Sequence, residues 1–311
     1  YADVPAQTGD TEQSPTPIIS IENLDNYIHD NKVSVKDLYL QISSMGNEKP
    51  DIVEGNDLPD FNPDDEYLQE IKSPIFYAVQ KNINIQTGQP TILDFDMQRI
   101  SQRINIVFNI RTEGNIKRED LAAPIIELSG ACGRFNIADA CLDTTRLYRM
   151  AHQVQPDEFT QTGEGTYRCV VHFHTLGVIP SAAKGHLNGP GILQVALQVS
   201  TPQLDSSGAP VVDEEGNPVK NSRYIYGAIN PYDELTAAQL IEVRDGKIYL
   251  RYSKEDVNIE ITTPLVIKAD QIVPNDTGMG WQPHDPTNPD DDIIIIFQPR
   301  TVGDYHDRLN E

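Results

Sequence analysis

Two histidines on one predicted strand have the spacing that best suits chemistry. His172 and His174 lie two positions apart, so a strand would place both imidazoles on the same face, where they could ligate a metal. A third ligand would have to come from His152 or His186, and no spacing ties either of them to the pair. The alternative, which we favour, is that both are polar residues on the solvated face of an amphipathic strand. We therefore predict no metal site.

Acidic residues are numerous, but their spacing predicts neither catalysis nor calcium binding. Among 47 Asp and Glu residues, carboxylate pairs suited to glycoside hydrolysis could be drawn almost anywhere. Asp285 and the run Asp290–Asp292 lack the Asp-x-Asp-x-Asp-Gly spacing of a calcium loop, and we interpret them as a solvated acidic loop. The sequence contains no Gly-x-Ser-x-Gly elbow, Walker loop, His-Glu-x-x-His motif or dinucleotide fingerprint. We predict no catalytic residues, no enzymatic activity and no cofactor.

The three cysteines are too few for a disulfide scaffold. Cys132 and Cys141 lie nine positions apart, a span that a hairpin could close, so a disulfide between them could form in an oxidising compartment. Two buried free thiols are the alternative that we favour. The absence of a Cys-x-x-Cys pair argues against a zinc ribbon or a thioredoxin-type centre.

The charge of the chain restricts its partners. Lys and Arg number 24 against 47 acidic residues, which gives a formal net charge of −23. Such a surface repels nucleic acid and anionic lipid, so we predict neither as a direct partner. The longest apolar run includes Ile293–Phe297 and is far shorter than the roughly 20 residues that span a bilayer. The start at Tyr1, without Met or a leader, leads us to expect a processed or trimmed product.

Apolar residues alternate with polar ones along most of the chain, which is the pattern of strands buried on one face. The alternating sets are Leu93, Phe95 and Met97; Ile104, Ile106, Phe108 and Ile110; Tyr167, Cys169, Val171 and Phe173; Leu193, Val195, Leu197 and Val199; and Val257, Ile259 and Ile261. Asp245-Gly246 predicts a hairpin turn. Helical periodicity is confined to Asp64–Lys72 and Tyr232–Val243, with Val33–Ile42 ambiguous. Strands of this kind must pair two sheets face to face, so we predict an all-β sandwich fold with few short helices.

The segment Thr91–Arg111 holds two strand patterns without a linker between them. We place a domain boundary at its junction near Gln98, which gives domains 1–98 and 99–311. The first part shows few clear strands for its length. We expect it to be a small or incomplete sandwich, whose missing strands are removed or supplied by a partner.

Four segments carry a resemblance to a known family: Met97–Phe108, Ile125–Gly130, Leu142–Thr145, and Gly278–Trp281 followed by Asp292–Phe297. Their order is a strand with an Arg-Ile element, a Leu-Ser-Gly turn, and a Gly-rich Trp segment before the last strand. In this order the chain resembles the fimbrillin-like proteins of Bacteroidales over roughly residues 73–299. It departs from them at residues 131–133, which read Ala-Cys-Gly where the family would have a Met-Ala-Gly type sequence.

The resemblance implies two transthyretin-like β-sandwich domains in a lipoprotein-derived pilus subunit, fimbrial tip or anchor at the cell surface and outer membrane. Its partners would be other fimbrial subunits or ligands on host or bacterial surfaces, with a lipid anchor as its only membrane contact. Polymerising members of the family assemble by donor-strand exchange. The donor here would be Ile293, Ile294, Ile295, Ile296 and Phe297, with the tail Gln298–Glu311. We favour the alternative that Ile293–Phe297 is an ordinary core strand.

The leading hypothesis is therefore a non-enzymatic fimbrial or adhesion protein. The second is a glycan-binding surface lipoprotein of a carbohydrate-uptake system, which would present coplanar aromatic rings drawn from Tyr224, Tyr226, Tyr249, Tyr252 and Trp281. The third and least favoured hypothesis is a metal-dependent hydrolase built on His172 and His174.

Overall fold

The computed structural model describes residues 18–30, 33–46, 48, 50, 66–80, 82–85, 87–114, 116–182, 189–203, 205–251, 256–262, 264–268 and 298–299. Within these residues the fold is all-β, as the sequence predicts. The helical segments are short: η1 (Asn26–Asp30), η2 (Val35–Asp37), η3 (Arg118–Asp120) and α2 (Tyr232–Ala237).

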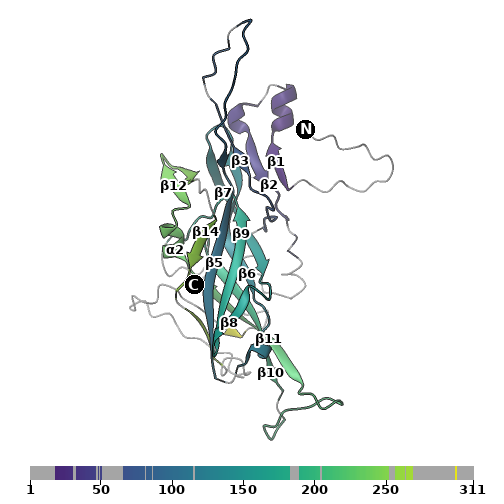
Figure 1. Ribbon diagram of the computed structural model, residues 1–311. Coiled ribbons are helices and arrows are strands. Elements are labelled where there is room, and N and C mark those ends of the chain that lie inside the picture. The colour runs from purple at the N-terminus through teal and green to yellow at the C-terminus, as the bar shows by residue number, and fades with distance from the viewer. Residues whose placement is uncertain are drawn as a thin grey trace, which may run out of the picture.

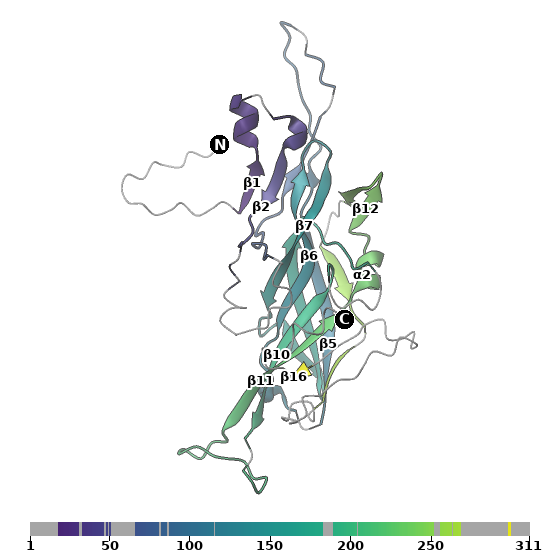
Figure 2. The same ribbon diagram turned by 180° about the vertical axis from the view of Figure 1, so that it is seen from behind.

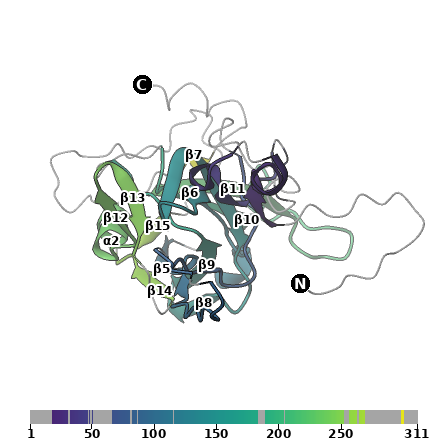
Figure 3. The same cartoon turned by 90° about the horizontal axis from the view of Figure 1, so that it is seen from above.

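Two large sheets make up most of the molecule and lie face to face (Figure 3). The first follows the order β12-β13-β7-β6-β10-β11-β16, and β2 pairs with β6 while β1 pairs with β2. Its strands are β1 (Ile19–Glu22), β2 (Tyr39–Ile42), β6 (Ile125–Asn136), β7 (Cys141–Gln153), β10 (Leu193–Pro202), β11 (Lys220–Ile229), β12 (Ile241–Arg244), β13 (Lys247–Leu250) and β16 (Gln298–Pro299).

The second sheet follows the order β14-β5-β9-β8, and β15 also pairs with β5. Its strands are β5 (Gln102–Glu113), β8 (Phe159–Gly163), β9 (Thr166–Thr175), β14 (Val257–Glu260) and β15 (Leu265–Lys268). Strands β14 and β15 run parallel to β5, whereas β9 is antiparallel to it. A separate short pair joins β3 (Phe76–Tyr77) to β4 (Gln98–Arg99).

The core between the sheets consists of the residues that the alternating patterns predict to face inward. On β5, Ile104, Ile106, Phe108 and Ile110 are fully buried, and the intervening residues are more exposed. Their counterparts on β9 and β10 are also buried and belong to the same core cluster: Cys169, Val171, Phe173, Leu193, Val195, Leu197 and Val199. Burial of apolar area on the facing sides of two sheets stabilises this sandwich.

The predicted Asp-Gly hairpin is confirmed. It joins β12 to β13, with Arg244 opposite Lys247. Asp245 and Gly246 have φ values of 49° and 73°, so both central residues are in the left-handed region that a type I′ turn requires.

The predicted helix over Asp64–Lys72 is wrong in its described part, residues 66–72, which are extended. The N–H of Leu68 donates to the carbonyl of Arg149 on β7 at 2.8 Å, and Met45 donates to the carbonyl of Tyr67 at 2.8 Å. Long-range backbone pairing on both sides therefore overrides the local pattern. The helix predicted over Tyr232–Val243 forms only as α2, because the chain enters β12 at Ile241.

Of the described residues before Gln98, those of β1 and β2 extend the first sheet. Tyr39 to Gln41 on β2 pair with Arg134 to Asn136 on β6. The guanidinium of Arg134 binds both Glu22 on β1 and Asp143 on β7, which ties the N-terminal hairpin to the sandwich. The division into domains 1–98 and 99–311 and the transthyretin-like topology of each remain predictions.

Candidate functional site

A long extended arm, of which residues 76–80, 82–85 and 87–97 are described, leaves the sandwich at β3 and returns in β4 (Figures 1 and 2). Its base is fixed, since Phe76 pairs with Arg99 and Tyr77 with Gln98. The Tyr77 hydroxyl donates a hydrogen bond to the carbonyl of Ile137 at 2.5 Å, and its ring packs edge-on against Phe135. Beyond this paired base, the described residues of the arm project away from the sandwich (Figure 1).

Large apolar side chains are exposed along both legs of this arm. Ile92 is 84% exposed, Phe95 53% and Met97 57%. The full set of exposed apolar residues is Phe76, Val79, Ile83, Ile85, Ile92, Leu93, Phe95 and Met97. A soluble monomer rarely leaves so many neighbouring apolar side chains in water, and such surfaces mark interaction sites.

The half-buried strand predicted from Leu93, Phe95 and Met97 is therefore wrong, because only Gln98–Arg99 forms a strand at that end. Among the described residues of the arm, no backbone pairing is found beyond its base. Extended backbone that carries exposed apolar side chains and leaves its N–H and C=O groups unpaired is a template for an added strand. The arm is the first candidate interaction surface.

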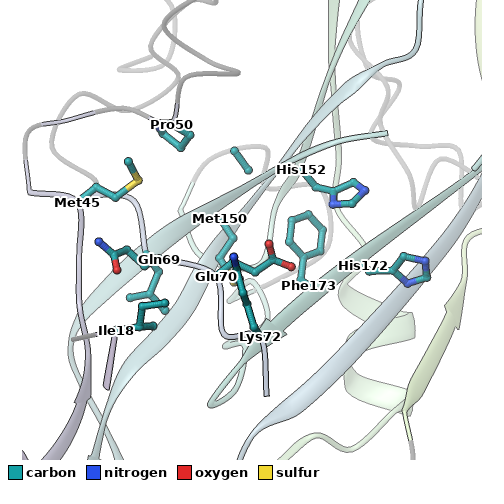
Figure 4. A pocket seen from close by; sticks show the side chains of 12 residues that line it. Ile18, Met45, Pro50, Gln69, Glu70, Lys72, Met150, His152, His172 and Phe173 are labelled. Carbon is teal, nitrogen blue, oxygen red and sulfur yellow. The ribbon is translucent and has the colours of Figure 1, made fainter. Parts of the chain in front are cut away.

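A pocket of about 400 Å³ is the second candidate (Figure 4). It lies between β7, β9, the segment 66–72, and Met45 and Pro50. Its most deeply buried members are Leu68, Met150 and Phe173. The other lining residues are Ile18, Met45, Pro50, Gln69, Glu70, Lys72, Ala151, His152 and His172. Its volume and largely apolar walls are in the range of small-ligand and side-chain binding sites.

One carboxylate joins the two histidines of the pocket. Glu158 Oε2 lies 3.0 Å from Nε2 of His152 on β7, and Glu158 Oε1 lies 3.3 Å from Nε2 of His172 on β9. Nδ1 of His172 contacts Asn105 Oδ1 at 2.7 Å, so both its nitrogens are engaged. Because β7 and β9 belong to different sheets, the cluster bridges the two layers.

The pKa values of this cluster follow from burial and from its hydrogen bonds. Burial and the neighbouring Arg103 lower the pKa of His172. For Glu158, burial alone would raise the pKa, but hydrogen bonds from the Gln155 N–H and from His152 outweigh it and lower the pKa. A neutral imidazole carries a single N–H, so a neutral His172 donates to only one of the two oxygens that its nitrogens face, Glu158 Oε1 or Asn105 Oδ1.

The other predicted ligand, His174, does not join this cluster. Its Nε2 lies 3.0 Å from Ser101 Oγ in a buried site, so the two imidazoles of β9 bind different partners. Across the described residues, no three metal-ligating side chains gather into a site that could hold an ion. His186 lies outside the described part of the chain.

The structure does not form the disulfide that the spacing of Cys132 and Cys141 allows. Cys132 faces Leu147 across the β6–β7 pair, whereas Cys141 faces Asn136. Four residues of strand, or roughly 13 Å, therefore separate them, beyond the roughly 7 Å that a disulfide spans. Both are free and buried, as is Cys169. Burial raises the pKa of the Cys132 thiol to about 12.

Several predicted site residues lie outside the described residues. These are the assembly strand Ile293, Ile294, Ile295, Ile296 and Phe297, the acidic residues Asp285 and Asp290–Asp292, and the aromatic residues Tyr252 and Trp281. The side chains of Tyr224 and Tyr226 are also not described. Tyr249 is half-buried and lies under the guanidinium of Arg244, 4.2 Å from the centre of its ring.

Sequence reasoning missed Glu158 and the pocket. One carboxylate among 47 acidic residues carries no signal of its own. His152 and His172 meet only because their strands pack in opposite sheets, and a single sequence does not reveal that packing. The arm carries a signal, the alternation of Leu93, Phe95 and Met97, but alternation alone does not show whether the strand is covered.

Comparisons with known proteins leave the family open. No family of known proteins matches the chain, and no curated protein matches it. Among solved structures, the chain is similar to one from Bacteroides ovatus described as a "putative adhesin", with 10% identity and a TM-score of 0.35. The alignment covers 81% of this chain and 71% of that one. A similarity this low carries no argument about function. In the part of the chain that the structure describes, no helix is long and apolar enough to cross a membrane.

Proposed function

We propose that this chain is a non-enzymatic cell-surface fimbrial subunit or adhesion protein, which assembles by accepting a strand of a neighbouring subunit along the arm 76–97. The exposed apolar arm is the observation that carries this proposal. An added strand would satisfy its backbone groups, and alternate side chains would fix the register. Burying four of its large apolar side chains would contribute on the order of 6–12 kcal/mol before the cost of association.

The donor in this proposal is the C-terminal segment Ile293–Phe297 with the tail Gln298–Glu311. In the free chain Gln298 and Pro299 pair with β11 as β16, and they would leave that pairing on assembly. The segment is five consecutive apolar residues, which suits a strand that is buried on both faces once inserted. The assembled protein would reside at the outer membrane surface, in a fimbrium, and would be attached there through a lipid anchor. The resemblance of the sequence to fimbrillin-like proteins supports this location.

Size-exclusion chromatography of the full chain with an added peptide of residues 293–311 tests the proposal. We expect the peptide to co-elute with the chain. Phe95→Asp and Ile92→Asp each place a charge on the arm and should abolish the complex. Val243→Asp is the matched control, because Val243 on β12 is equally apolar, 66% exposed and outside the arm.

Equal peptide binding by the arm variants and the Val243→Asp control would show that the arm is not the acceptor. Absence of any complex would remove strand assembly and would leave the role of a tip or anchor protein. Circular dichroism of each variant distinguishes a lost contact from a lost fold.

A further inference from the structure

One end of the molecule carries nearly all of its exposed large apolar side chains. Among the described residues, the exceptions are Val243 on β12 and Val212 in the loop between β10 and β11. The others belong to the arm or to an N-terminal patch on β1, η1 and η2, and both lie at the end from which the arm projects (Figures 1 and 2). The N-terminal patch consists of Ile19, Ile21, Tyr27, Ile28 and Val35. Since these side chains are exposed, the arm does not cover the patch of its own chain.

The N-terminal patch is held in place by hydrogen bonds within its own segment. Ile19 and Ile21 lie two positions apart on β1, so they share one face of the strand. Among the described residues β1 pairs only with β2, which leaves its other edge open. The side-chain amide of Asn23, just before η1, donates to the carbonyl of Asp37 in η2 at 3.1 Å. A surface ordered in advance loses less entropy when it binds a partner.

The apolar area at this end is large enough for a stable dimer. The side chains of the arm and the patch are 38–84% exposed. At roughly 150–250 Å² for a large side chain, they leave on the order of 1,000 Å² of apolar surface in water on each copy. The largest apolar patch of a typical monomer is about 300–600 Å². A stable interface buries about 800 Å² on each partner, which a contact between two such ends would supply.

We propose that the N-terminal patch binds the arm of a second copy of this chain, and that two copies exchange arms about a twofold axis. Each end carries both halves of the contact, so each arm lies on the patch of the other copy and the assembly closes at two chains. The patch contacts apolar side chains of the arm, whereas the donor strand of the proposed function pairs with the backbone of the arm. The inference therefore goes beyond strand assembly.

Acidic residues at this end act against the contact and make it sensitive to salt. Asp25 is exposed beside the patch, and Asp94 and Asp96 are exposed in the arm. Two copies with a net charge of −23 also repel each other as a whole. Salt screens this repulsion, so the dimer should become several-fold stronger between about 50 and about 500 mM sodium chloride.

Sedimentation equilibrium of the full chain measures the dimer. Ile28→Asp in the patch and Ile92→Asp in the arm should each weaken dimerisation at least about tenfold, because each substitution places a charge in both apolar contacts of the dimer. Val243→Asp is the matched control. It adds the same charge at an exposed apolar position away from this end and should dimerise like the unchanged chain. Circular dichroism reports whether each variant stays folded.

Mixtures of variants test which surfaces meet. In a heterodimer of the Ile28→Asp and Ile92→Asp chains, both substitutions fall in one contact and the other contact is unchanged. An equal mixture should therefore recover a dimer at a concentration where each variant alone is monomeric. Ile92→Asp mixed with Phe95→Asp is the control mixture, because each of its contacts carries a substitution and no dimer should return.

Four results would each overturn the proposal: a monomeric unchanged chain, an open-ended series of oligomers, a dimer that weakens with added salt, or no recovery in the mixture of Ile28→Asp and Ile92→Asp. Strand assembly fails separately. A dimer that does not bind the 293–311 peptide would remove strand assembly alone. Conversely, the Ile28→Asp chain should still bind that peptide, because its arm is unchanged.

Discussion

Gly130 occupies a point where three segments of backbone meet. It has a φ of +82° at the irregularity of β6 next to Ser129. A Cβ there would lie 2.6 Å from the nitrogen of Gly191, 2.8 Å from the carbonyl oxygen of Ile179 and 2.9 Å from Cβ of Pro190. The Ser129 hydroxyl donates a hydrogen bond to the Gly189 carbonyl at 2.7 Å in the same place. The Leu-Ser-Gly motif thus joins β6 to the segments before β10.

Replacing Gly130 by alanine should cost stability in two ways. The left-handed backbone costs a residue with a Cβ about 1–2 kcal/mol. The contacts under 3.0 Å are mostly with backbone atoms that cannot rotate away, and overpacking of this kind costs about 1–3 kcal/mol more. Gly208→Ala is the matched control, since Gly208 also has a φ of +82° but nothing within 4 Å of the added Cβ.

Urea unfolding followed by circular dichroism measures both variants against the unchanged chain. We expect Gly130→Ala to lower the free energy of unfolding by about 2–5 kcal/mol and Gly208→Ala by no more than about 2 kcal/mol. Equal losses would show that the close approach around Gly130 is not a constraint, and would refute the packing described for the Leu-Ser-Gly segment, which lies within β6 and is not the turn that the sequence predicts.

Three further outcomes follow from the buried and titrating groups. Burial raises the pKa of Cys132 to about 12 and also raises that of Cys169, so neither thiol should react with a thiol reagent in the native chain; rapid modification of both would contradict this. The folded state lowers the pKa of His172 from 6.5, through burial and Arg103, and that of Glu158 from 4.5, because hydrogen bonds outweigh its burial. Because both pKa values are lower in the folded state, the unfolded chain binds more protons. The stability that each group contributes is therefore present above its ordinary pKa, 6.5 for His172 and 4.5 for Glu158, and is lost as the pH falls below it. The urea midpoint should drop in two ranges, below about pH 6.5 through His172 and below about pH 4.5 through Glu158, and Glu158→Gln should lose the second drop; an unchanged profile below about pH 4.5 in that variant would rule out the contribution of Glu158. Arg149 is buried 3.3 Å from the Glu127 carboxylate, so Arg149→Met should cost about 3–5 kcal/mol, and a loss under about 1 kcal/mol would contradict a structural ion pair.

The sandwich could be predicted from the sequence because its signals are local. Ile104, Ile106 and Phe108 alternate with polar residues over a single strand, and this pattern alone fixes which side is buried. The hairpin at Asp245-Gly246 is likewise set by two residues that tolerate positive φ.

The candidate surfaces depend on pairings between distant segments, which local patterns do not encode. Alternation at Phe95 and Met97 shows that a strand could form, but not whether another strand covers it. Residues 66–72 have a helical pattern, yet their hydrogen bonds run to β7 and to residues 43–45. The distance between Cys132 and Cys141 depends on the register of β6 and β7, which sequence spacing leaves open.

Hydrogen–deuterium exchange of the arm tests the central claim most directly. Amides of residues 78–97, measured by mass spectrometry with and without the 293–311 peptide, report whether a strand is added there. The account predicts fast exchange in the free chain and strong protection along the arm in the complex. Unchanged exchange across the arm at a saturating peptide concentration would contradict it.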